Sequence, residues 1–162
     1  MNTFLRVLVI AILAVPGGLP AVSAQGEPVI LSVDGGVADG AVHEFTRSQL
    51  EALGHAEIDT TTPWHDGVIR FEGVPLALLM EHVGAKGRIA AVRALNNYKT
   101  EVPLTDFSQF GVILALKKNG EYMPVSDKGP LFIVYPFDSN EMLNGEVYYS
   151  RSAWQVRRIT IE

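Results

Sequence analysis

Short runs in which apolar and polar residues alternate recur along most of the chain, and this pattern predicts strands. Residues 57–61 alternate and are rich in β-branched side chains, which favours a strand. Residues 155–161 alternate as well and close the chain. Asn119-Gly120 separates two further strand-like segments, so a hairpin is expected there. The remaining predicted strands are residues 29–33, 43–45, 68–71, 89–94, 99–102, 112–116 and 131–135.

Two segments carry helical rather than strand-like signals. Thr46 and Gln49 have the spacing of a capping box, and we expect a helix of about two turns from there to Leu53. A second helix is expected to begin at Pro75 and to end at Gly84, because apolar residues between them fall on one face. The sum is an α+β domain, a β-rich mixed-sheet domain with short helices.

The N-terminal residues have the pattern of a secretory signal peptide. Arg6 is the only charge in the first 24 residues, an apolar stretch surrounds and follows it, and Val22-Ser23-Ala24 supplies small residues for cleavage. The apolar stretch is shorter than the roughly 20 residues that span a bilayer. We therefore expect residues 1–24 to be a signal peptide, residues 25–162 to form one domain without a membrane span, and the mature protein to be periplasmic or secreted.

Composition narrows the class of function. Removal of Arg6 with the signal peptide leaves 12 of the 13 basic residues and all 18 acidic ones, a net charge of −6. An acidic chain without a basic run is not suited to binding nucleic acid. The chain contains no cysteine, which excludes disulfides, iron–sulfur clusters and a cysteine nucleophile.

The order of several short motifs points to one family. Phe71-Glu72-Gly73-Val74-Pro75-Leu76 follows Thr60-Thr61-Thr62-Pro63-Trp64, and Gly129-Pro130-Leu131 precedes Ser152-Ala153-Trp154 near the end. In this order the chain resembles the molybdopterin-binding domain of the sulfite oxidase superfamily, including periplasmic methionine-sulfoxide reductases. The resemblance covers nearly all of the mature chain and implies that fold, with molybdopterin as the cofactor to consider. Further matching segments are residues 31–37, 45–50, 96–98, 102–104 and 114–120.

The departures from the family pattern are as informative as the matches. The resemblance implies a cysteine thiolate bound to molybdenum at the position of Thr60 or Thr61, and a hydroxyl is a poor substitute because it stays protonated near neutral pH. The resemblance also implies positively charged side chains that bind the pterin phosphate. Most of these are missing here, and Lys99, Lys128 and Arg151 remain to replace them. The other altered family positions are Asp127-Lys128, Phe132 and Ala153.

The resemblance places Thr60, Thr61 and Trp64 in the former cofactor cleft, with Asn97 and Tyr98 on the opposite side of it. The threonines and the asparagine have ordinary structural interpretations as well. Threonines are common on edge strands, and asparagines are common in turns.

Two cations complete the candidate set for cofactor binding. Lys128 and Arg151 are suited to holding an anion, and both also fit the role of solvated surface charge. The four histidines lack the spacing of a metal site on one helix, and Met142 stands where a calcium loop needs an oxygen ligand. No catalytic residue and no metal ligand is therefore predicted.

Three functions are compatible with these features. The first is an exported, non-catalytic or degenerate member of the family that binds a small-molecule or pterin-like ligand, or a partner protein, in the old cleft. The second is a true molybdopterin-dependent oxidoreductase whose metal has no thiolate ligand from the protein. The third is an extracytoplasmic partner of a membrane-bound redox or signalling protein.

Overall fold

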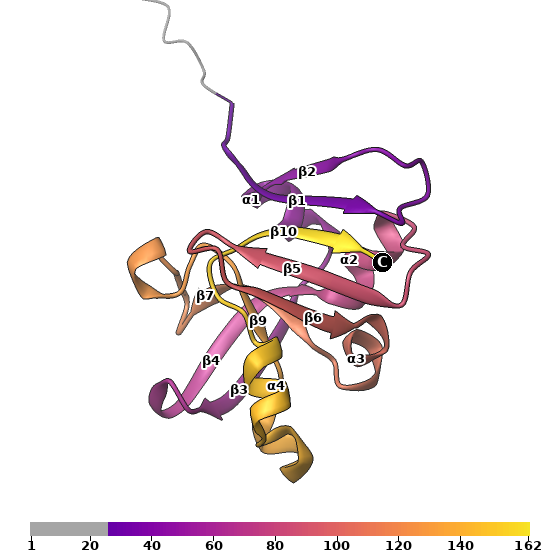
Figure 1. The fold of residues 1–162 in the computed structure, drawn as a ribbon. Coiled ribbons are helices and arrows are strands. Elements are labelled where there is room, and N and C mark those ends of the chain that lie inside the picture. Colours follow the sequence, from indigo (N-terminus) through magenta and orange to yellow (C-terminus); the bar gives the residue numbers. More distant parts are fainter. Residues whose placement is uncertain (1–25) are drawn as a thin grey trace, which may run out of the picture.

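Two five-stranded sheets make up most of the computed structural model, which describes residues 26–162 (Figure 1). The predicted signal peptide lies outside the described residues. One sheet, sheet A, has its strands in the order β2 (His43–Thr46), β1 (Val29–Gly35), β10 (Val156–Ile161), β5 (Ile89–Ala94) and β6 (Lys99–Pro103). The other, sheet B, contains β3 (Ala56–Thr62), β4 (His65–Pro75), β7 (Ile113–Lys118) and β8 (Glu121–Tyr122), with β9 (Phe132–Val134) also paired to β7.

The sheets confirm the predicted mixed architecture. The first and last strands, β1 and β10, pair in parallel, whereas the other strand pairs of sheets A and B are antiparallel. The predicted hairpin is present, since Lys118 pairs with Glu121 across the turn. Asn119 and Gly120 both have positive φ angles there, 51° and 85°, which is the backbone geometry that an Asn-Gly hairpin turn requires.

The described residues contain four α-helices, two more than the pattern predicts. Helix α1 (Arg47–Leu53) begins with the expected capping box, in which Thr46 and Gln49 exchange hydrogen bonds between side chain and backbone. Helix α2 (Leu76–His82) follows Pro75 as expected. Helices α3 (Leu104–Gln109) and α4 (Glu146–Arg151) were not predicted, because each has only six residues and begins without a side-chain cap.

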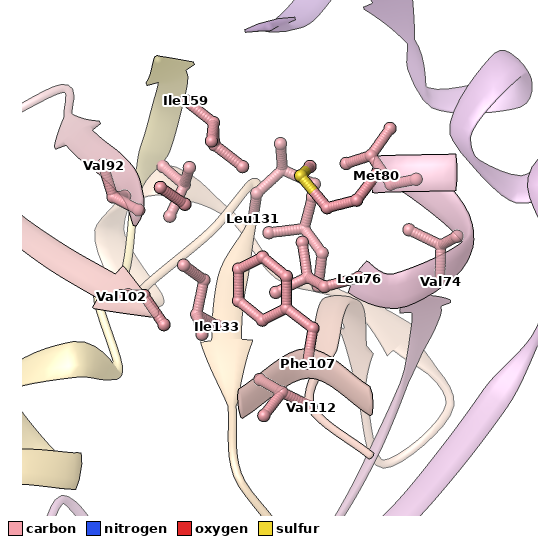
Figure 2. Close-up of a cluster of buried hydrophobic side chains, with 14 of the residues drawn as sticks. Val74, Leu76, Met80, Val92, Val102, Phe107, Val112, Leu131, Ile133 and Ile159 are labelled. Carbon is pink, nitrogen blue, oxygen red and sulfur yellow. The ribbon is translucent and has the colours of Figure 1, made fainter. Parts of the chain in front are cut away.

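Strand β9 lies between two hydrophobic cores. Ile133 of β9 and the preceding Leu131 point into the larger core, which also contains side chains from sheet A and from α2 and α3 (Figure 2). Phe132 and Val134 point to the opposite side, into a smaller core with Phe71. The alternation of side chains along one strand therefore joins both cores.

The same strand fixes the segment that leads into sheet A. Phe132 forms an isolated antiparallel bridge with Trp154. Backbone hydrogen bonds flank this bridge, from Ile133 N to Ala153 O at 2.9 Å and from Val156 N to Leu131 O at 3.0 Å. Trp154 is thereby held against sheet B just before the chain enters β10.

Among the described helices, none has the length and apolar character needed to cross a membrane.

Candidate functional site

The end of β3 is where the resemblance places the family's metal ligand. Burial alternates along this strand, so Thr60 and Thr62 face the interior while Thr61 faces outward. Thr60 is fully buried, and its hydroxyl donates to the Thr61 carbonyl at 3.2 Å and accepts from the Asp138 backbone N–H at 3.1 Å. The Thr60 hydroxyl is therefore satisfied within the protein.

Asp138 contacts the outward-facing Thr61 at the end of β3. It lies in the 3₁₀ turn of residues Phe137–Ser139, and its carboxylate accepts from the Thr61 backbone N–H at 2.6 Å and from the Thr61 hydroxyl at 2.5 Å. These hydrogen bonds lower the pKa of Asp138 from its ordinary value, because they stabilise the charged carboxylate. Thr60 and Thr61 are thus both hydrogen-bonded to one residue.

Aromatic side chains surround Trp64 in the turn that follows. Its ring makes edge-to-face contacts with Phe132, Tyr149 and Trp154 at centroid distances of 5.8, 5.9 and 5.4 Å. Phe137 lies 6.3 Å away and precedes Asp138. Such pairs stabilise a cluster beyond the burial of area alone. Trp64 therefore packs the space beside Thr60 and Thr61.

Lys128 and His65 complete this region, which we call the tryptophan site: Thr60, Thr61, Trp64, His65, Lys128, Asp138 and Trp154. Lys128 has a left-handed backbone, with φ of 64°, and its Nζ lies 5.9 Å from the centroid of the Trp154 ring. His65 Nδ1 lies 2.8 Å from the Thr62 hydroxyl. Burial, followed by the nearby charge of Lys128, lowers the pKa of His65, so this imidazole is neutral near pH 7.

His65 is a site residue that the sequence did not indicate. The spacing of the histidines bears only on a shared metal site, and none of the other three lies beside His65 in sequence. Its position at the start of β4, directly after Trp64 of the β3–β4 turn, is the available signal.

The remaining predicted cofactor-binding residues lie elsewhere. Asn97 lines a hollow on the outer face of sheet A. The Tyr98 hydroxyl donates to the Ser150 carbonyl of α4 at 2.8 Å. The structure therefore brings together Thr60, Thr61, Trp64 and Lys128, whereas Asn97 lies at the hollow on sheet A and Tyr98 is bonded to α4. A role of these residues in binding a cofactor stays a prediction.

Arg151 is held in a buried ionic network. Its guanidinium donates to Asp106 Oδ2 at 2.8 Å, and the Tyr135 hydroxyl donates to the same oxygen at 2.7 Å. Asp106 is only 6% exposed. Burial, together with the hydrogen bond to Asp106, raises the pKa of Tyr135, so its hydroxyl remains protonated as the donor. The network connects α3, the end of β9 and α4. The positive charge of Arg151 is therefore already paired with the Asp106 carboxylate.

One cluster with the composition of a metal site lies on the outside of sheet B. Ligand atoms of His55, Glu57 and Glu72 come within 4.8 Å of one another. Arg70 Nε lies 3.9 Å from the Glu57 carboxylate, and Lys117 is directly opposite Glu72 across the β4–β7 pair. His55 Nε2 also lies 3.2 Å from the Glu57 carboxylate, so Glu57 is already engaged by protein groups on both sides.

The tryptophan site does not fit a molybdenum centre of the family's type. It offers hydroxyl, carboxylate and imidazole groups but no soft thiolate. The hydroxyls of Thr60 and Thr61 are both engaged in hydrogen bonds with Asp138, so neither stands free as a metal ligand. Lys118, another nearby cation, is paired with Asp127.

The two sheets, with both parallel and antiparallel strand pairs, and the short helices define an α+β domain. A comparison with family profiles matches residues 31–138 to the oxidoreductase molybdopterin binding domain, and the chain belongs to that family. A comparison with curated proteins finds no match.

The fold is also found in a solved structure. The sulfane dehydrogenase SoxCD from Paracoccus pantotrophus matches with a TM-score of 0.62 and 20% sequence identity. The match covers 81% of this chain but only 37% of the SoxCD chain. The likeness at this identity establishes the shared fold, and the chain spans little more than a third of the length of that protein.

We predict that Arg151→Met lowers the free energy of unfolding by about 2–3 kcal/mol, because it leaves the buried Asp106 carboxylate without its cation. The double variant Asp106→Asn with Arg151→Met should lose less than the sum of the two single changes. Urea denaturation measures the free energy of unfolding of the single and the double variants. Arg88→Met, at an exposed position, is the control and should change stability by less than about 0.5 kcal/mol. An unchanged stability in Arg151→Met would contradict the network.

Asp138→Asn should reduce stability at pH 7 and have a smaller effect in acid. Because the folded-state pKa of Asp138 is lowered from 3.8, its ionised form contributes stability above that pH, and the contribution is lost as pH falls through the lower folded value. The measurement is the difference in unfolding free energy between wild type and variant at each pH. Asp66→Asn, on the exposed part of β4, is the matched control. A difference that stays constant down to pH 3 would refute the assignment.

Proposed function

We propose that this chain is an exported, non-catalytic member of its family that binds a ligand or a partner without holding molybdenum. The observation that carries the proposal is the hydrogen bonding of Thr60 and Thr61 to Asp138 at the position of the family's metal ligand. A thiolate there would be free to bind a metal. These hydroxyls instead stabilise the fold.

The chemistry of the tryptophan site favours a small, planar anion as ligand. Lys128 supplies a positive charge close to the Trp154 ring, and the neutral His65 supplies a hydrogen-bonding nitrogen nearby. Aromatic rings stack on planar heterocycles, and a lysine gives a charge-assisted hydrogen bond to a carboxylate or phosphate. A pterin-like molecule has both properties, so the site supports retention of such a ligand after loss of the metal.

Export would place the domain beside the outer segments of membrane proteins. The N-terminal signal pattern supports this location. A membrane-bound redox or signalling protein is therefore the class of partner that an accessory role implies.

Protein purified from the periplasm of cells that make molybdenum cofactor is expected to contain far less than one molybdenum atom per chain and to begin at Gln25. The reason is that the tryptophan site lacks a soft ligand. Elemental analysis, the visible spectrum and mass spectrometry provide the readouts. A thiolate-bearing family member produced in the same cells is the positive control. Stoichiometric molybdenum in this chain would overturn the non-catalytic assignment.

Binding at the site can be followed by intrinsic fluorescence, because both tryptophans of the chain, Trp64 and Trp154, lie in it. We expect 6-carboxypterin to quench this emission in a saturable way. Lys128→Met should raise the dissociation constant about tenfold, the effect of losing a charge-assisted hydrogen bond. Lys86→Met, which removes an exposed lysine outside the site, should leave it unchanged. Quenching that is equal in both variants would count against a ligand at Lys128.

A further inference from the structure

The outer face of sheet A carries an open hollow with a volume of about 1070 Å³. All five strands of the sheet contribute to its lining, which is mostly polar. Small side chains, Ser32, Ala91 and Thr160, line it together with longer charged ones. The hollow is on a different sheet from the tryptophan site, so it is a second surface with its own chemistry.

An irregularity in β10 concentrates positive charge in this hollow. The register between β10 and β5 shifts after Val156 pairs with Ala94, so that Arg158 pairs with Arg93 and Arg157 is an extra residue. Arg157 and Arg158 are both exposed, whereas consecutive residues of a regular strand face opposite sides. A bulge of this kind re-aims a side chain.

Neighbouring strands add to the cluster. Lys99 of β6 pairs directly with Arg93 of β5, so that four cations stand on three adjacent strands, β10, β5 and β6 (Figure 1). We call this group the basic cluster: Arg93, Lys99, Arg157 and Arg158. Like charges placed opposite one another across strands destabilise a sheet. The cluster is also unusual for a chain with a net charge of −5.

Most of this charge has no counterpart within the fold. Arg158 lies 3.3 Å from the carboxylate of Asp34. Over the described part of the chain, Arg93, Lys99 and Arg157 have no carboxylate within 4.0 Å. An anionic binding partner would relieve the repulsion among these three side chains and gain bidentate contacts from the arginines.

We propose that the basic cluster is the docking site for an acidic segment of a partner protein. The cluster extends across three strands, which suits several separate carboxylates better than one compact anion. Glu44, Glu101 and Glu162 also line the hollow, and they would repel a uniformly anionic surface while fixing the position of an acidic peptide. A concave face bordered by carboxylates is likewise a poor match for a flat anionic bilayer.

The test measures binding of a fluorescein-labelled oligoglutamate peptide by anisotropy at low ionic strength, with oligoglutamine of the same length for comparison. Wild-type protein should bind the glutamate peptide only, with an affinity that falls as salt is added. The double reversal Arg93→Glu with Arg157→Glu should weaken binding by at least about tenfold. Arg47→Glu with Lys86→Glu makes the same change in net charge outside the hollow and should leave binding unchanged.

Several results would overturn the proposal. These are absence of binding by wild type, an equal loss in both double variants, or binding to phosphatidylglycerol vesicles in place of the peptide. Far-ultraviolet circular dichroism checks that each variant folds, and Arg93→Gln with Arg157→Gln replaces the double reversal if that variant does not. Quenching by 6-carboxypterin should be unaffected by all of these changes, which separates failure here from failure at the tryptophan site.

Discussion

Strand β9 and the segment around Trp154 hold the two halves of the domain together. Leu131 and Ile133 complete the larger core while Phe132 completes the smaller one, and the Phe132–Trp154 bridge ties sheet B to the chain that enters sheet A. The backbone of Gln155 also donates to the Lys128 carbonyl at 3.0 Å, which positions Lys128 beside Trp154. The geometry of the tryptophan site is therefore a consequence of how the two sheets are joined.

This fold has kept the framework of a cofactor domain while the chemistry at its centre differs. The chain has no cysteine, and Asp138, from a turn far along the sequence, forms hydrogen bonds with both Thr60 and Thr61. These bonds are an internal structural contact at the strand end where the resemblance places the family's metal ligand. Binding, rather than electron transfer, is the function that we propose for such a site, and the basic cluster is a separate surface that we propose for recognition of a partner.

Local signals predicted most of the fold, and long-range pairing accounts for what they missed. The Asn119-Gly120 turn and the Thr46–Gln49 capping box can be predicted from local sequence, because the interacting groups lie within a few residues of each other. The pairing of Arg151 with Asp106 and of Asp138 with Thr61 joins residues 45 and 77 positions apart, and no spacing rule indicates either. The bulge at Arg157 also depends on the pairing of β10 with β5. Alternation of residues 155–161 alone therefore predicts one continuous strand.

The central position of β10 in sheet A has a consequence for how the sheet is held together. This strand, the last of the chain, lies between β1 and β5, and therefore separates the N-terminal hairpin of β1 and β2 from the rest of the sheet. That hairpin has no other strand partner in sheet A, so its place in the sheet depends on β10 alone. Removal of β10 would therefore leave sheet A as two disconnected groups of strands, β1 with β2 and β5 with β6.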